Sequence, residues 1–301
     1  MAKLETLRDI REAVGSDDFA NLLGSNMHKR LQKAYAGVPG EYAKYCDIIE
    51  VNDFKNQNII TLTEAGDLDK LLEGEEYREA KFDESASAYR VCKYGKQLTV
   101  PWEMVRNDDL AGVNRMVDSI GRAARRTVAK FATALLVGTT ASSTVTSALA
   151  KASLEAAITE FITRVDATTG EPLGIEPKFL IVPPALKWTA MELINSTLIV
   201  VRGDTDAVFG NKNTLENALD PIIEPFLADT NDWYLAADPA VLPGIELAFL
   251  RGYRDTPAML RKKTDSSEEL DFDTDSYVYK VRHVFGGARI NANALLKVSV
   301  T

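Results

Sequence analysis

A regular stripe of apolar residues between positions 108 and 137 constrains the fold more than any other feature of the sequence. Its members follow one another in steps of three or four residues, the spacing of one face of an α-helix. They are Leu110, Val113, Val117, Ile120, Ala124, Val128, Phe131 and Leu135. Asn107, Asp108 and Asp109 precede the stripe and favour a helix start. We therefore expect one helix over residues 108–137, well above the usual three turns in length.

The same segment is rich in cations. They are Arg115, Arg122, Arg125, Arg126 and Lys130. One interpretation is an ordinary core helix with a solvated side. A helix so long and only half buried is also typical of a scaffold that presents a surface to neighbours. The arginines then have two possible partners, nucleic acid phosphates or acidic groups of another subunit.

Two strands around an acidic segment are predicted before this helix. Residues 59–63 are rich in β-branched side chains, and the chain returns through residues 81–97 as a second strand. Pro101 is expected to end the ladder pairing of that strand. Glu73, Glu75 and Glu76 lie between the strands, near the tip of the hairpin. Because a two-stranded ribbon is marginal alone in water, we expect it to lie on a neighbouring subunit.

The first 36 residues predict two amphipathic helices separated at Gly15. Either they form a local helical hairpin, or they dock on the same chain or a neighbour as an arm. Beyond the long helix, helical and strand patterns alternate, which indicates a compact α/β unit. The expected helices are 153–165 and 184–194, and the expected strands are 179–182, 197–201, 221–226, 233–237, 245–250 and 277–285. Gly286 and Gly287 are expected to kink the last strand, and residues 289–300 close the chain.

Composition narrows the class of protein. The net charge of −9 argues against a sequence-specific DNA-binding protein, which usually carries a basic domain. It is compatible with a container whose wall does not adhere to packaged nucleic acid. The two cysteines, Cys46 and Cys92, suggest free thiols in a reducing compartment, with a disulfide between them as the alternative. Neither a signal sequence nor a membrane span is predicted, since no apolar run approaches about 18 residues.

The sequence contains no recognisable catalytic motif. His28 and His283 have no second His or Cys at the spacing of metal ligands, so no metal or other cofactor is predicted. Phosphate-binding and nucleophile-elbow motifs are absent. The acidic repeat that starts at Asp271 resembles a calcium loop but has Ser276 and Arg282 where glycine and glutamate are needed. Arg-Gly-Asp at 202–204 is best interpreted as a turn. We therefore favour a structural, self-assembling protein over an enzyme.

Three patches resemble the major head subunit of Mu-like tailed bacteriophages, a branch of the HK97-type capsid proteins. The first is Tyr-x-Val-x-Lys-Tyr-Gly-Lys-x-Leu-x-Val from Tyr89, followed by Asn-Asp-Asp-Leu and the Arg-rich helix. The second is Trp233-Tyr-Leu followed by Pro243 and Ile245. The third is Phe272-Asp-Thr-Asp, leading into Val281-Arg-His and then the glycine pair. Their order along the chain makes the combination more specific than any single patch.

The resemblance implies an α+β fold of the HK97 type, with the following parts. Residues 1–56 would form an N-terminal arm and 57–96 the extended hairpin (E-loop). Residues 97–195 would form the peripheral domain around a spine helix at about 108–137. Residues 196–265 would form the axial domain, and 266–301 would return to the peripheral domain as its C-terminal strands.

The function implied by the resemblance is that of a major capsid protein. Such subunits self-assemble as pentamers and hexamers into an icosahedral shell that encloses double-stranded DNA without sequence-specific binding. Separate scaffold, portal and decoration proteins are expected partners, a membrane is not, and assembly in the cytoplasm of a bacterial host yields the virion capsid. Other HK97-type subunits carry a long N-terminal scaffolding segment, whereas here the expected arm begins almost at Met1. No covalent crosslink is predicted.

Three alternatives remain at this point. An encapsulin-like nanocompartment subunit would share the fold and hold cargo enzymes. An unrecognised α/β enzyme would need a polar pocket, and a phage tail or adaptor protein is a third possibility. For the capsid interpretation, the predicted contacts between subunits join an acidic hairpin tip to cations on a neighbour's spine helix. The residues are Glu73, Glu75, Glu76, Arg115, Arg122, Arg125 and Arg126.

Overall fold

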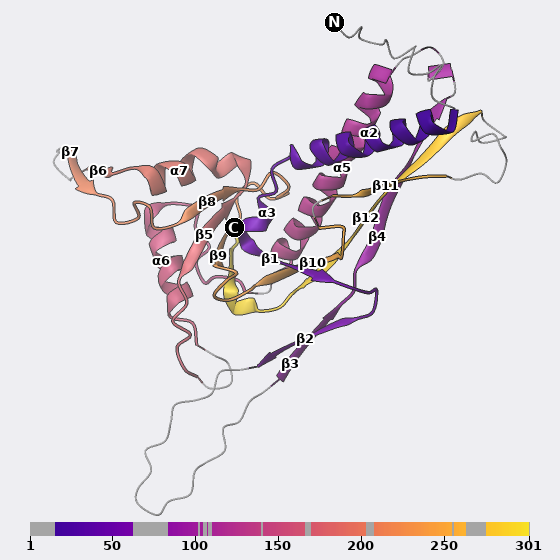
Figure 1. Ribbon diagram of the computed structural model, residues 1–301. Helices are drawn as coiled ribbons and strands as arrows, with labels where there is room; N and C mark the ends of the chain where they lie inside the picture. The colour runs from indigo at the N-terminus through magenta and orange to yellow at the C-terminus, as the bar shows by residue number, and fades with distance from the viewer. Residues whose placement is uncertain are drawn as a thin grey trace, which may run out of the picture.

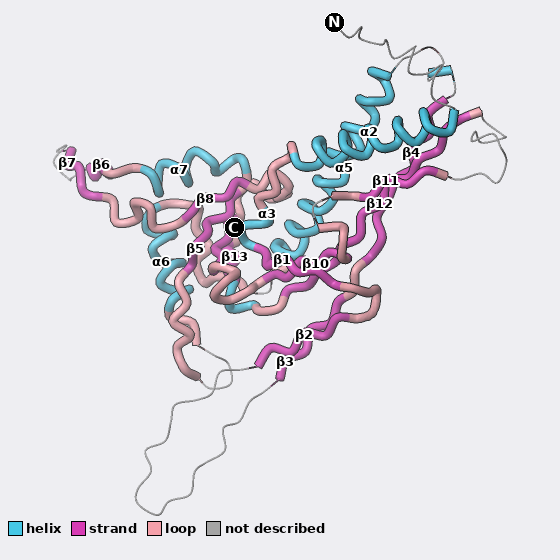
Figure 2. Tube along the Cα trace, in the orientation of Figure 1, coloured by secondary structure: helices cyan, strands magenta, loops and turns pink. Residues whose placement is uncertain are grey.

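The computed structural model places two β-sheets around one long helix (Figures 1 and 2). It describes residues 16–62, 84–101, 103–104, 107, 110–139, 141–165, 170–202, 208–254, 256–262 and 275–300. The first expected helix, the acidic hairpin tip and the aspartates at 271 and 273 lie outside the described residues. Within the described part of the chain, no helix is long and apolar enough to cross a membrane.

The predicted long helix is α5, Leu110–Val137. Its buried side chains follow the predicted stripe at Val113, Val117 and Val128. Beyond Val128 the buried face shifts by one position, so that Leu136 is fully buried while Leu135 is only partly so. The reason is that this half of α5 contributes to a core shared with both sheets, so more of its circumference is covered.

Helix α2, Ser16–Ala36, packs across α5 (Figure 1). Met27 and Leu31 are buried with the start of α5. The helices touch at Gly121, where an added Cβ would lie 2.9 Å from the carbonyl oxygen of Leu31. Arg30 donates two hydrogen bonds, of 2.8 and 2.7 Å, to the Asp118 carboxylate. These contacts therefore support docking of this helix on its own chain, which was one of the predicted alternatives.

The first sheet has five strands drawn from almost the whole chain. They are β1 Cys46–Val51, β10 Ile245–Leu250, β12 Ser276–Arg289, β11 Ala258–Arg261 and β4 Cys92–Pro101. The order is β1-β10-β12-β11, and β4 pairs along the other side of β12. β1 is parallel to β10, whereas all pairs with β12 are antiparallel. Helix α5 covers the face that carries Tyr279, Val281 and Phe285.

One local expectation for these strands was wrong. The expected single strand 81–97 is two strands, because β3 Glu84–Tyr89 pairs with β2 Gln57–Leu62 and β4 then leaves to join β12. Buried Val91 separates the two. Pro101 ends the ladder as predicted, since it is the last residue of β4 and lies opposite Ser276.

Gly286 and Gly287 lie within β12, which continues to Arg289. A Cβ on Gly286 would lie 2.4 Å from the Arg90 carbonyl oxygen, and one on Gly287 would lie 2.3 Å from that of Glu246. The glycines therefore permit neighbouring backbone to approach closely, which is another common reason for glycine within a strand.

The second sheet has four strands and is buried on both faces. Its order is β13 Leu295–Val298, β9 Trp233–Ala237, β5 Pro177–Val182 and β8 Asp220–Ile223. Helices α6 Lys151–Ile162 and α7 Lys187–Asn195 cover one face, with Leu180 and Trp233 in that core. Phe179 and Tyr234 point into the core shared with α5. The apolar composition of residues 179–182 predicted this two-sided burial.

The remaining elements are short. α3 is Tyr42–Tyr45, and the 3₁₀ turns η1 Pro184–Leu186 and η2 Ala292–Ala294 precede α7 and β13. β6 Leu198–Arg202 and β7 Val208–Lys212 form a separate hairpin. Elements on both sides of residue 195 share one core, since α6, β5 and α7 pack together with β9.

Candidate functional site

The exposed face of α5 carries most of the arginines that the sequence singled out. Arg115, Arg122 and Arg126 are exposed, and their spacing of seven and four residues places them along one side of the helix. Lys130 continues the line one turn further. The structure thus leaves three of the four predicted arginines available to a partner. Their acidic counterparts, Glu73, Glu75 and Glu76, lie outside the described residues, so the predicted contact stays a prediction.

Arg125 has a different environment. Its guanidinium carbon lies 4.9 Å from the ring centre of Tyr35 and 5.0 Å from that of Tyr42, close enough for cation–π contact with both. Gly40 closes over it, since a Cβ there would lie 2.0 Å from a guanidinium nitrogen. Arg125 therefore holds α2 and α3 against α5 within its own chain.

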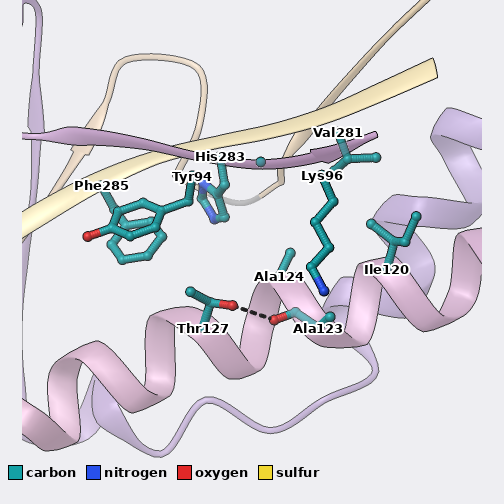
Figure 3. A pocket seen from close by; sticks show the side chains of 10 residues that line it. Tyr94, Lys96, Ile120, Ala123, Ala124, Thr127, Val281, His283 and Phe285 are labelled. Atoms are coloured by element: carbon teal, nitrogen blue, oxygen red, sulfur yellow. Dashed lines mark hydrogen bonds between the residues drawn. The ribbon is translucent and has the colours of Figure 1, made fainter. Parts of the chain in front are cut away.

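An apolar cavity of about 230 Å³ lies between α5 and the strands β4 and β12 (Figure 3). Ile120, Ala124 and Thr127 line it from the helix, and His283 and Phe285 line it from β12. Lys96 extends from β4 toward the helix at one side, and the Thr127 hydroxyl donates to the Ala123 carbonyl. The wall is largely apolar, and its titratable side chains are Tyr94, Lys96 and His283.

His283 is buried beneath this cavity and serves as an internal hydrogen-bonding group. The Val284 N–H donates to Nδ1 at 3.1 Å, which assigns the ring proton to Nε2, 3.1 Å from the Tyr35 hydroxyl oxygen. Burial, assisted by the positive charge of Arg125, lowers the pKa of His283 from 6.5 to about 4. The imidazole is therefore neutral at physiological pH.

Two buried carboxylates were missed by the sequence reasoning. The Tyr89 hydroxyl donates to Glu246, and the Tyr45 hydroxyl donates to Glu224 at 3.5 Å. Burial raises the pKa of both carboxyl groups. A glutamate in the apolar sequence Ile-Glu-Leu-Ala-Phe-Leu of β10 was the available signal for the first. Each tyrosine–glutamate contact joins distant segments, so both have a structural role.

The described residues contain no cluster of three His, Cys, Asp or Glu side chains suited to a metal ion. Cys46 is buried and Cys92 is exposed, and neither forms a disulfide. The residues that the sequence singled out lie on the exposed face of α5 or form contacts inside the subunit.

Solved structures of other proteins share this fold. A virus-like particle from Pyrococcus furiosus superimposes with a TM-score of 0.57 at 8% identity, covering 91% of this chain and 98% of that one. The capsid of a native GTA particle gives 0.54 at 9% identity, with 88% and 92% covered. Gordonia phage Cozz gives 0.53 at 10% identity, with 85% and 84% covered. The fold is the α+β capsid fold of the HK97 type.

The sequence itself identifies the family. The family of phage capsid proteins matches residues 84–298, well over half of the chain, and this chain belongs to it. No curated protein sequence matches. The protein is therefore a phage major capsid protein, a structural component of a virion shell.

Proposed function

We propose that this chain is the major head subunit of a tailed bacteriophage of the Mu-like branch, assembling as pentamers and hexamers into an icosahedral shell around double-stranded DNA. The observation that carries the proposal is the family match, which extends from β3 through β13. The three sequence patches around Tyr89, Trp233 and Val281 support the Mu-like assignment. Assembly takes place in the bacterial cytoplasm, with separate scaffold, portal and decoration proteins as partners.

The β2–β3 ribbon supports assembly through an exchanged arm. Among the described strands these two pair only with each other, and they project from the body of the subunit (Figure 1). Tyr89 and Val91 anchor the base of the ribbon in a small core with Ala248 and Val284. An isolated pair of strands is marginally stable, and a neighbouring subunit would supply the surface that it lacks.

The acidic residues between these strands supply the electrostatic part of the proposal. Glu73, Glu75 and Glu76 of one subunit pair with Arg115, Arg122 and Arg126 of the next. Replacing the three glutamates with glutamine is expected to lower shell yield severalfold at low salt and to have less effect at high salt, because exposed ion pairs are screened. Glu50→Gln, at an exposed position of β1, is the control. Unchanged yield of the triple variant at low salt would eliminate this pairing.

A nanocompartment that holds cargo proteins is the second candidate, favoured by the superposition on the virus-like particle. Particles isolated from cells that carry the gene distinguish the two. We expect the chain to co-sediment with nuclease-resistant double-stranded DNA. A particle that contains a single cargo enzyme and no DNA would favour the nanocompartment, and a chain found only outside particles would contradict both.

A further inference from the structure

Trp188 is the most exposed large apolar side chain in the described part of the protein. It is 73% exposed, whereas tryptophan is highly buried on average. The buried face of α7 carries Ala190 and Ile194. Trp188 precedes Ala190 by two residues, about 200° around the helix, so it points away from the core. Lys187 lies beside it, with its amine 5.0 Å from the indole.

A second group of exposed apolar side chains lies at the opposite end of the four-stranded sheet. Val165 is 51% exposed and Val241 is 71% exposed. Val165 is in the connection that leads from α6 into the start of β5, and Val241 follows the end of β9. Arg164, next to Val165, donates to the carbonyl oxygens of Asn293 and Leu295, and Leu295 pairs with Ala236 near the end of β9, so both valines belong to one end of the sheet.

Trp188 belongs to the other end, because α7 follows the last residue of β5. Figure 1 places α7 at the upper side of this unit and the end of α6 at its lower side. A six-residue strand separates the ends by roughly 20 Å. No single partner residue could cover both patches, and one copy of the chain could present each patch to a different neighbour.

A cation lies beside the exposed tryptophan, and a carboxylate lies at the valine end. Lys187 supplies a cation next to Trp188. Glu176 is exposed immediately before β5, at the valine end. At that end Lys178 is already bound to Asp238 at 2.5 Å, and Arg164 is bound to carbonyl oxygens of residues 293 and 295. The valine end of a second copy of this chain therefore offers an apolar surface for Trp188 and a carboxylate for Lys187.

We propose that Trp188 of one subunit docks on the Val165 and Val241 end of the next, with Lys187 facing Glu176. Contacts between different patches of identical subunits are heterologous, and they close into rings when the rotation permits. The inference rests on the proposed function, since the ring would be the pentamer or hexamer of the shell. Trp188 would be its anchor, in keeping with the prominence of tryptophan among interface hot spots.

Trp188→Ala and Trp188→Phe, each in the full chain, test the anchor. Trp188→Ala is expected to reduce the fraction of protein in shells at least tenfold, while Trp188→Phe retains most of it. Because the side chain is exposed, both variants should unfold at the wild-type temperature. Shells formed by Trp188→Ala at wild-type yield would overturn the proposal while leaving the capsid function intact.

Fluorescence and a charge exchange give independent readouts. The wild-type signal minus that of Trp188→Phe isolates Trp188 from the other two tryptophans of the chain. Its accessibility to acrylamide should fall several-fold on assembly.

Lys187→Glu should lower shell yield, and adding Glu176→Lys should restore it. Unchanged quenching in intact shells, or no recovery in the double variant, would contradict this contact. Absence of shells for the wild type under every condition would overturn the proposed function as well.

Discussion

The four-stranded sheet is covered on both faces by apolar side chains, whereas strands of the five-stranded sheet carry buried polar residues and this sheet borders a cavity. Leu180, Leu235 and Leu296 form a continuous apolar core with α6 and α7. The five-stranded sheet instead buries His283 and Glu246 and leaves about 230 Å³ beneath α5. The first unit comes mainly from consecutive elements, and the second is assembled from segments spread from β1 to β12.

This difference indicates how the two regions are stabilised. The four-stranded unit depends on the density of its apolar packing. The five-stranded unit also depends on hydrogen bonds and cation–π contacts that bring distant segments into register, as Arg125 does for α2 and α3. Three sets of substitutions test the contrast.

The largest effect is expected from removing apolar volume in the four-stranded sheet. Leu235 is fully buried, and Leu235→Ala should lower the free energy of unfolding by about 2–5 kcal/mol. Urea titration of the unassembled subunit, followed by circular dichroism, measures it. The exposed Leu198→Ala, on the adjoining hairpin, is the control and should change little. A loss below about 1 kcal/mol for Leu235→Ala would contradict the packing account.

The polar interior of the five-stranded unit should make stability depend on pH. The pKa of His283 falls from 6.5 to about 4 on folding. Between these values the unfolded chain binds more protons than the folded chain, so stability decreases as pH falls through this window. The free energy of unfolding should therefore be about 3 kcal/mol lower near pH 4 than above pH 6.5 because of this one group.

The substitution His283→Gln isolates the contribution of His283 to the pH dependence of stability. The raised pKa values of Glu224 and Glu246 act in the opposite direction, and they are common to both proteins. The wild-type stability minus that of the variant, measured by urea titration from pH 4 to pH 8, should therefore rise with pH through the window and then level off. A difference that does not vary with pH would contradict the neutral, buried imidazole.

The smallest effects are expected from adding volume, and here the two regions should differ in sign. Ala124 lines the cavity beneath α5, so Ala124→Leu should stabilise the subunit by roughly 0.5–2 kcal/mol. Ala190 is fully buried under α7, and Ala190→Leu should destabilise it by about 1–3 kcal/mol. Thermal unfolding compares the pair directly. The same sign for both substitutions would remove the packing distinction between the regions.

The sequence predicted the elements whose patterns are local. The stripe of α5, the two-sided burial of residues 179–182, and the strands β9 and β10 follow from periodicity and apolar runs. Long-range partners have no such local signal. The division of residues 81–97 depends on β12, almost 200 residues later in the sequence, and the role of Gly286 depends on the backbone at Arg90.

Only part of the candidate site could be predicted from the sequence, because the rest depends on contacts between distant segments. Helical spacing suffices to place Arg115, Arg122 and Arg126 on one exposed face. It does not reveal that Arg125, adjacent to Arg126, turns toward Tyr35 and Tyr42, because those rings are brought in by other helices. The exposure of Trp188 also emerged only from the packing of α7, since a tryptophan in an apolar helix is most often buried.

Electron microscopy of the purified full chain, with its mass measured by light scattering after gel filtration, tests the central claim most directly. We predict closed shells, or pentameric and hexameric rings, that persist as the protein is diluted from its assembly concentration. A monomer or dimer at every salt concentration, with crowding agents and with its phage scaffold protein present, would contradict the account of this chain as a self-assembling capsid subunit.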